Sequence, residues 1–210
     1  MMLFCETTAF ADTDQSNFRM HITILSASTR LNRQSHRVAI ALKKAIEAEG
    51  VHSAEILDLA EYQFPVLEEV LHRHPAPPAG LAEFADKIRR SDAHIFVSPE
   101  YNGSYTAALK NAVDYLKEGE FSKKVIGIAS VTAGMLGGIR GALAMQQLVL
   151  AISALPIPQM LTVGQVSQRF DENGALIEPA FEKNLRHFLH HFLWLAEAVA
   201  QKKESEVVLN

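Results

Sequence analysis

Along most of the chain, short runs rich in β-branched residues alternate with longer amphipathic stretches. The runs predict strands over residues 21–25, 54–58, 93–98, 124–129 and 159–163, and the stretches predict helices over 38–48, 81–90, 106–116, 138–152 and 178–201. Two successive parallel strands need a helical crossover between them, so this alternation predicts a parallel sheet. Because such crossovers are right-handed, helices should cover both faces of the sheet.

The number of strands decides between two arrangements of such a sheet. About five strands fit the flavodoxin-like order 2-1-3-4-5 better than the six strands of a full dinucleotide-binding fold. We therefore predict an α/β flavodoxin-like fold, a three-layer sandwich around a five-stranded parallel sheet. At 210 residues, 48% of them hydrophobic, the chain fits one domain. We place that domain at 20–204, between an extension at 1–19 that has no clear period and a C-terminal tail at 205–210. Residues 72–80, with three prolines, should form a loop.

Composition and charge argue against several classes of partner. The net charge of −4 and the lack of a basic stripe disfavour a nucleic-acid binder, which needs clustered Lys and Arg. Residues 1–19 lack the basic start and apolar core of a secretory signal, and no apolar run reaches the roughly 18 residues of a membrane span. Cys5 is the only cysteine, so no intrachain disulfide is expected. We expect a cytoplasmic protein that binds neither nucleic acid nor membrane.

The loop after the first strand, residues 26–35, is rich in hydroxyl groups. Ligands of open parallel sheets bind at the carboxyl ends of the strands, and this loop leads into a helix whose first N–H groups favour an anion. Hydroxyl donors are offered by Ser28, Thr29 and Ser35, a charge by Arg30, and further donors by Asn32 and Gln34. From these we take as candidate phosphate ligands Ser28, Arg30, Gln34 and Ser35. The alternative is that Ser35 or Asn32 caps the helix while Arg30 and Arg33 face water. Neither G-x-x-x-x-G-K-[ST] nor G-x-G-x-x-G occurs here, which favours a mononucleotide.

The loop after the third strand, residues 98–104, combines a rigid residue with an aromatic one. Pro99 fixes the backbone, and Tyr101 offers an aromatic face with a polar tip, so the loop could grip a planar heterocycle. The candidate ligand-binding residues are Pro99, Glu100, Tyr101 and Asn102. The alternative is an ordinary turn at Asn102-Gly103 followed by a helix cap at Ser104 or Thr106.

Glycines dominate the loop after the fourth strand, residues 130–138. They allow the backbone to approach a flat ligand and to direct N–H groups at its edge. The candidates in this loop are Ser130, Gly134, Gly137 and Gly138. The alternative is a flexible loop before a helix, in which Gly137 and Gly138 relieve steric crowding.

Together these segments resemble the NADPH-dependent FMN reductase family, which includes quinone, azo-dye and chromate reductases. The family's first loop reads roughly G-S-x-R followed by a serine, its second begins P-E-Y-N-x-S and continues into L-K-N-x-x-D, and its third is S-x-G-x-x-G-G. The second motif is the most specific, because Pro99-Glu100-Tyr101-Asn102 leads here to Leu109-Lys110-Asn111 and Asp114. The resemblance covers the chain from Met20 to the last helix.

The resemblance implies a role for each loop. Ser28, Arg30 and Ser35 would hold the FMN phosphate. The ribityl chain and isoalloxazine would be lined by Pro99, Glu100, Tyr101 and Asn102, and the pyrimidine edge would be bordered by Gly134, Gly137 and Gly138. The chain departs from the family pattern at three places: Ala27 replaces a glycine, Tyr105-Thr106 replaces a frequent x-Pro, and the stretch before Gly134 is longer.

The activity implied is that of an FMN-dependent NAD(P)H oxidoreductase. The flavin would take a hydride from NADPH or NADH and reduce a quinone-like or other small acceptor, or free FMN would itself be the acceptor, so we assign no catalytic side chain. A flavodoxin-type electron carrier and a flavin-binding redox sensor are the alternatives. The mild charge of −4 disfavours the carrier, whose docking surface is usually strongly acidic. The family also implies a homodimer or homotetramer.

Three histidines near the C-terminus raise the question of a metal. His187 and His191 have the i,i+4 spacing of a metal-binding pair, and His190 lies beside them. No third ligand is evident, and a solvated helix face or an interface explains the cluster better than a metal site does. We therefore assign no metal site.

Overall fold

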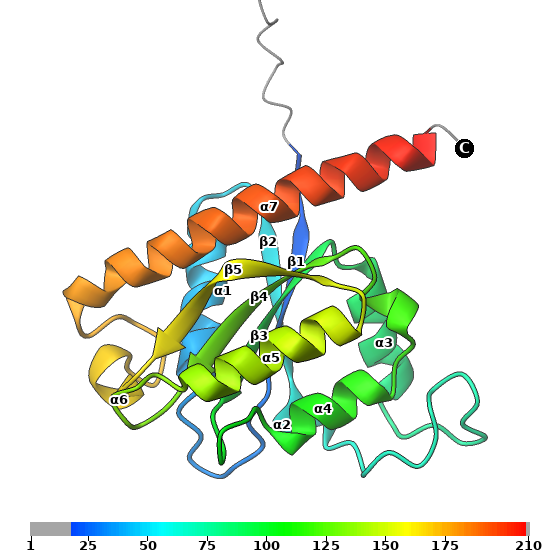
Figure 1. Ribbon diagram of the computed structural model, residues 1–210, viewed down its shortest axis with the longest axis horizontal. Helices are drawn as coiled ribbons and strands as arrows, with labels where there is room; N and C mark the ends of the chain where they lie inside the picture. The colour runs from blue at the N-terminus through cyan, green and yellow to red at the C-terminus, as the bar shows by residue number, and fades with distance from the viewer. Residues whose placement is uncertain (1–17, 209–210) are drawn as a thin grey trace, which may run out of the picture.

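One sheet of five parallel strands forms the centre of the molecule (Figure 1), in the predicted order β2-β1-β3-β4-β5. The computed structural model describes residues 18–208, of which 118, 207 and 208 by their backbone alone. The strands are β1 (His21–Ser26), β2 (Ser53–Asp58), β3 (Ala93–Pro99), β4 (Val125–Val131) and β5 (Leu155–Val163). The helices are α1 (His36–Ala48), α2 (Leu59–Tyr62), α3 (Leu81–Arg90), α4 (Ala107–Asp114), α5 (Ile139–Ala151), α6 (Val166–Arg169) and α7 (Glu182–Val208), with 3-10 turns at Glu118–Glu120 and Pro179–Phe181.

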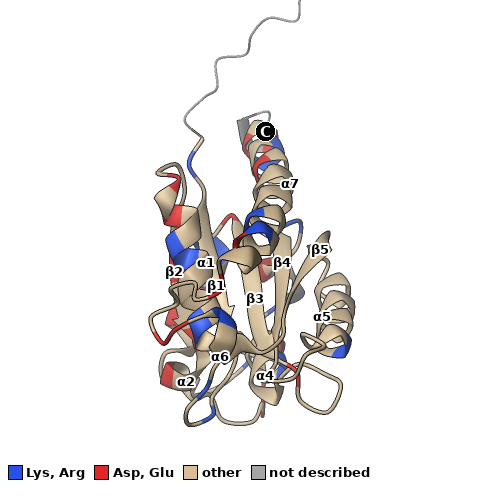
Figure 2. Cartoon of the chain, turned by 90° about the vertical axis from the view of Figure 1, so that its left-hand side faces the viewer, with Lys and Arg blue, Asp and Glu red and all other residues tan. Residues whose placement is uncertain are grey.

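Helices cover both faces of the sheet, because the chain moves first to one side of β1 and then to the other. The apolar side chains of α1 and α7 form one buried cluster with one face of the strands. Those of α3, α4 and α5 form a second cluster with the opposite face. Figure 2 shows the sheet between α1 and α5. This is the predicted three-layer flavodoxin-like sandwich.

The long helix α7 packs closely over β4 at Gly127. A Cβ atom at this position would lie 2.8 Å from Phe188 Cζ and 3.1 Å from Phe192 Cδ2, so the two rings leave room for glycine alone. The pairing register between β4 and β5 shifts at the same place, between Ile126 and Ile128. A glycine inside a strand often marks such a close approach or irregularity.

The ends of several elements differ from the prediction. β5 begins at Leu155 rather than at residue 159, and its first half contains Pro156 and Pro158. Proline removes a backbone donor, but β5 is an edge strand of the sheet, where prolines are tolerated. The last helix begins at Glu182 and runs to Val208, past the predicted end at 201, so residues 205–208 continue a helix rather than a tail. Residues 1–17 of the predicted extension lie outside the described residues.

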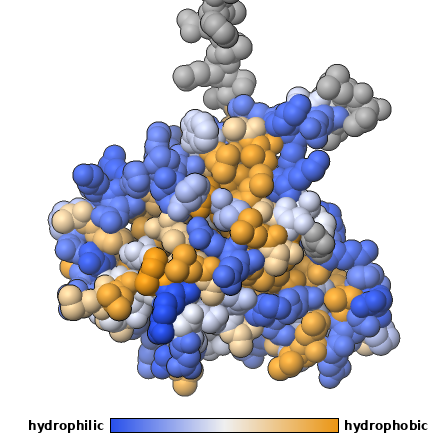
Figure 3. All heavy atoms as spheres, in the orientation of Figure 1, coloured by the Kyte–Doolittle hydropathy of each residue, from blue (hydrophilic) through white to orange (hydrophobic). Residues whose placement is uncertain are grey.

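The surface is mixed in character. On the face drawn in Figure 2, Lys and Arg are interspersed with Asp and Glu over the described part of the chain. Apolar patches interrupt the polar surface in Figure 3. Large exposed apolar side chains include Ile139, Leu143 and Leu150 on α5 and Trp194 on α7. Within residues 18–208, no helix is both long and apolar enough to cross a membrane.

Candidate functional site

The three loops singled out in the sequence meet at one edge of the sheet. They follow β1, β3 and β4, which are consecutive neighbours in the strand order. Parallel pairing aligns the ends of these strands, since Ser26 is paired with Val97 and Pro99 with Val131. The carboxyl edge of a parallel sheet is where ligands bind in this architecture. We refer to residues 26–35, 98–106 and 130–138 as loops A, B and C.

Loops A and B touch through Tyr101. Ser28 is 1% exposed, and its Oγ lies 3.3 Å from Tyr101 Oη. The guanidinium of Arg30 lies 5.6 Å from the centre of the Tyr101 ring, within the range of a cation–π contact. Arg30 is itself exposed, so its charge remains available to a ligand. The structure therefore brings Ser28, Arg30 and Tyr101 together, and their role in binding a ligand stays a prediction.

At the end of loop A, two buried polar atoms have no partner. Ser35 occupies the N-cap position of α1, yet its side chain makes no capping hydrogen bond, and its buried Oγ is unpartnered. Gln34 donates from Nε2 to the carbonyl of Asn32 at 3.3 Å, while its Oε1 is buried and unpartnered. Buried polar atoms are nearly always hydrogen-bonded in native proteins. A hydroxyl donor left free at a helix N-terminus is suited to an anion, and the Gln34 Oε1 to a hydroxyl donor.

The alternative for loop A, with Ser35 or Asn32 as a cap and with Arg30 and Arg33 in water, holds only in part: Ser35 occupies the N-cap position without a side-chain capping bond, and Arg33 is paired. Arg33 forms an ion pair with both carboxylate oxygens of Asp58, a residue that sequence reasoning missed. The Asp58 side chain is 6% exposed. The other predicted cation, Arg30, is the one that faces solvent.

Loop B contains the turn at Asn102-Gly103 that the alternative interpretation predicts. Tyr101 N donates to Ser104 O at 2.8 Å, and Ser104 N donates back to Tyr101 O at 3.1 Å. Asn102 and Gly103 between them have φ angles of 53° and 84°, the left-handed values that a two-residue type I′ turn requires. Asn102 is exposed at the tip of this turn. Pro99 is the last residue of β3 and is half-buried.

The Glu100 carboxylate of loop B is bound by the N-terminus of α5. Its Oε2 accepts from Gly141 N at 3.1 Å, and its Oε1 lies 3.2 Å from Arg140 Nη2. A carboxylate at this end of a helix is stabilised by the helix dipole and by the free N–H groups. Glu100 thus positions loop C and α5 relative to loop B. A role along the flavin remains a prediction for this residue.

Loop C is held by its own serine and glycines. Ser130 is fully buried, and its hydroxyl donates to Gly138 O at 2.7 Å. This hydrogen bond ties the end of loop C to the end of β4. Gly137 and Gly138 are buried, with positive φ angles, and a Cβ at Gly137 would lie 2.8 Å from Thr162 Cβ. Gly134 is exposed, and its N–H is donated to Thr132 Oγ1 at 3.1 Å. The two glycines therefore do relieve crowding, as the alternative supposed, in a loop that is tied down.

Thr106 joins loops A and B. Its Oγ1 donates to Ala27 O at 2.8 Å and accepts from Leu109 N at 3.2 Å, which caps α4. Its backbone N–H donates to Ser98 Oγ at 3.1 Å. Thr106 stands where the family frequently has proline, and its hydrogen bonds make it a clamp between the strand ends.

Replacing Thr106 with valine should destabilise the protein by about 2 kcal/mol, because the isosteric side chain leaves the buried Ala27 carbonyl and Leu109 N–H without a partner. Urea denaturation measures this change in the free energy of unfolding. Thr106→Ser keeps both hydrogen bonds and serves as the control. A valine variant as stable as the serine variant would contradict the clamp.

Asn111 and Asp114, which carried the resemblance, have structural roles. Asn111 Nδ2 donates to Pro65 O at 2.6 Å, and its Oδ1 accepts from Leu67 N at 2.8 Å. Asp114 pairs with Lys110 one helical turn earlier. The motif therefore fixes the segment after α2 against α4. A cavity of about 460 Å³ lies at this junction and is lined by Thr29, Leu59, Ala60, Gln63, Phe64, Ala108 and Asn111.

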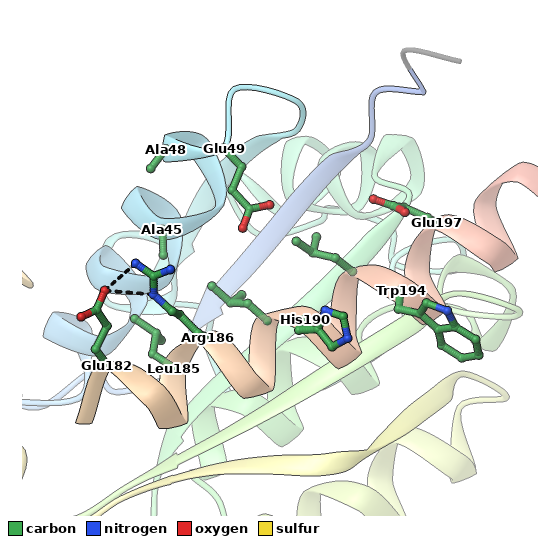
Figure 4. A pocket seen from close by; sticks show the side chains of 11 residues that line it. Ala45, Ala48, Glu49, Glu182, Leu185, Arg186, His190, Trp194 and Glu197 are labelled. Carbon is green, nitrogen blue, oxygen red and sulfur yellow. Dashed lines mark hydrogen bonds and ion pairs between the residues drawn. The ribbon is translucent and has the colours of Figure 1, made fainter. Parts of the chain in front are cut away.

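Another hollow lies away from the three loops. A groove of about 730 Å³ lies between α1 and α7. Figure 4 shows Trp194 and His190 on its α7 side and Ala45 and Ala48 on its α1 side. The ring centres of His187 and His191 on α7 are 4.5 Å apart. Among the described residues, no group of three or more His, Cys, Asp and Glu side chains is arranged to hold a metal ion.

Comparison with known proteins agrees with this geometry. The model of the family described as NADPH-dependent FMN reductase matches residues 20–168, which include all three loops. A quinone reductase of Pseudomonas putida is 32% identical over 162 residues, and the alignment covers 74% of this chain and 83% of the reductase. An NAD(P)H-dependent FMN reductase of Pseudomonas aeruginosa is 31% identical over 163 residues, and the alignment covers 75% of this chain and 85% of that reductase.

Solved structures give the same fold. The flavoenzyme NAD(P)H:(acceptor) oxidoreductase FerB of Paracoccus denitrificans superposes with a TM-score of 0.73 at 20% identity, covering 85% of this chain and 98% of its own. At this identity the likeness concerns the fold.

Proposed function

Because the chain belongs to the NADPH-dependent FMN reductase family, we propose that it binds FMN at the carboxyl edge of its sheet and oxidises NADPH or NADH. Bound FMN would supply the redox chemistry, by taking a hydride from the nicotinamide and passing reducing equivalents to a quinone-like or other small acceptor. The observation that carries the proposal is the buried, unpartnered hydroxyl of Ser35 at the N-terminus of α1. This is a donor placed where a phosphate is stabilised.

The residues of the three loops fit the chemical groups of FMN. Ser28, Arg30 and Ser35 would hold the phosphate through hydroxyl donors and one charge. The Gln34 Oε1, an acceptor without a partner, would suit a ribityl hydroxyl. Tyr101 would present its ring to the isoalloxazine. The remaining predicted contacts are Pro99, Glu100, Asn102, Ser130, Gly134, Gly137 and Gly138.

Glu100 and Ser130 would act chiefly by holding loop C in place, because both side chains are bound to protein groups. Because Gly137 and Gly138 have no side chain, the backbone of loop C could approach a flat ligand closely. A homodimer or homotetramer remains a prediction from the family resemblance. Met135 and Leu136 of loop C are apolar and exposed. A partner subunit or a second substrate would meet the site at this edge.

Two measurements test the proposal. The protein is mixed with FMN, passed through a desalting column and examined by its absorbance spectrum. It is then titrated with NADPH, with and without a quinone. We expect co-eluting flavin absorbance, bleaching by NADPH under argon, and quinone-dependent turnover of roughly 1 to 1000 per second. NADH in parallel compares the two donors. Protein that neither retains FMN nor oxidises either nucleotide would overturn the proposal. FMN binding without nucleotide oxidation would point to an electron carrier or a redox sensor instead.

A further inference from the structure

A buried carboxylate lies beneath loop A, in a position that the phosphate ligands do not use. Asp58 is the last residue of β2, and β2 pairs with β1, the strand from which loop A departs. The residue is 5% exposed. Its Oδ1 accepts from Ala60 N at 3.0 Å and caps the short helix α2. Capping alone does not require a charge, because asparagine caps helices equally well.

The charge of Asp58 is used by Arg33. The two terminal nitrogens of Arg33 each bind one carboxylate oxygen of Asp58, in a bidentate pair. Arg33 Nη1 also donates to the backbone carbonyl of Ser28 at 3.1 Å. Arg33 is near the end of loop A and Ser28 near its start, so one guanidinium ties the two arms of the loop to each other and to β2.

His36 braces the same carboxylate from the first turn of α1. Its Nδ1 lies 2.9 Å from Ser26 Oγ and 3.5 Å from Asp58 Oδ2. Burial lowers the pKa of His36 below its ordinary value, while the charge of Asp58 acts in the opposite direction. The contacts around Asp58 therefore reach from the end of β1 to the beginning of α1, which are the two ends of loop A.

We propose that Asp58 is a positioning residue for phosphate binding: by fixing Arg33, it holds loop A in the closed shape that presents Ser28, Arg30 and Ser35 to the phosphate of a mononucleotide. The charge of Arg33 is neutralised by Asp58, so Arg33 serves as a brace and the exposed Arg30 supplies the free cation. This inference rests on the proposed function, since it concerns the same site.

Asp58→Asn tests the proposal, because it keeps the cap of α2 and removes the charge that holds Arg33. Binding of FMN and of riboflavin, which lacks the phosphate, is measured by flavin fluorescence. We expect FMN affinity to fall about tenfold, as when partners that orient a ligating residue are removed from metal sites, and riboflavin affinity to stay unchanged. Simple electrostatics predicts the opposite, tighter FMN binding, because Arg33 is set free. Unchanged or tighter FMN binding, or equal weakening of both flavins, would overturn the proposal.

Two further variants complete the design. Arg33→Lys keeps the positive charge but loses the fork that reaches Asp58 and Ser28 together, so it should weaken FMN as Asp58→Asn does, even if the latter folds poorly. Glu172→Gln is the matched control, since it removes one negative charge from an exposed side chain that pairs with Arg37 outside the loop. Wild-type protein that binds no FMN would mean failure of the proposed function. Wild-type binding with equal binding by Arg33→Lys would mean failure of this inference alone.

Discussion

Replacing Ser35 with aspartate should weaken FMN binding about a thousandfold while leaving the protein folded. Ser35 occupies the N-cap position of α1 without a side-chain capping bond, so no such bond is lost, and a negative charge at a helix N-terminus is favourable. The same charge would repel a phosphate. At about 4 Å and an effective dielectric constant near 20, each unit of phosphate charge would cost about 4 kcal/mol. That corresponds to a loss of affinity of about a thousandfold.

The measurement is a fluorescence titration with FMN together with thermal unfolding of the protein without flavin. Ser35→Asn is the matched control, because it has a similar size and capping ability without the charge. We expect the asparagine variant to bind FMN far better than the aspartate variant, at similar melting temperatures. If the aspartate variant bound FMN as well as wild type, the phosphate would have to lie elsewhere, and the role assigned to loop A would be wrong.

Much of the fold was predictable because its signals are local. Strand-like runs and amphipathic stretches recur along the chain, and the right-handed crossover rule turns that alternation into a layered sheet. The beginning of β5 was missed because Pro156 and Pro158 are read as strand breakers. Their tolerance depends on the edge position of the strand, which is a property of the assembled sheet.

The candidate site was predictable at the level of loops and less so at the level of contacts. Hydroxyl-rich and glycine-rich segments after strands mark the carboxyl edge whatever the details of packing. Whether a side chain faces the ligand or the protein is decided by neighbours distant in sequence. Glu100 binds the N-terminus of α5, and Asp58 binds Arg33 across 25 positions of the chain. No local pattern around either carboxylate predicts its partner.

Gly138→Ala in loop C should be strongly destabilising. Gly138 has a φ angle of 74°, and a Cβ there would lie 2.4 Å from Ser130 Oγ and 3.1 Å from Glu100 Cβ. The left-handed backbone costs an L-residue about 1–2 kcal/mol, and overpacking costs about 1–3 kcal/mol more. We expect a loss of about 3 kcal/mol in the free energy of unfolding, together with weaker FMN binding as loop C shifts. Gly119→Ala, where no atom lies within 4 Å of the new Cβ, is the control.

Ser130→Ala shows whether the clash with the hydroxyl is the cause. Alone, it removes the hydrogen bond to Gly138 O and should cost about 1 kcal/mol. In the double variant the missing Oγ makes room for the new methyl group, so the two losses should not add. Denaturant unfolding of the four proteins should give a coupling of about 1–2 kcal/mol in the direction of rescue. Additive losses would show that backbone strain and the Glu100 contact dominate. Loop C would then depend on the left-handed conformation of Gly138 more than on its fit over the buried serine.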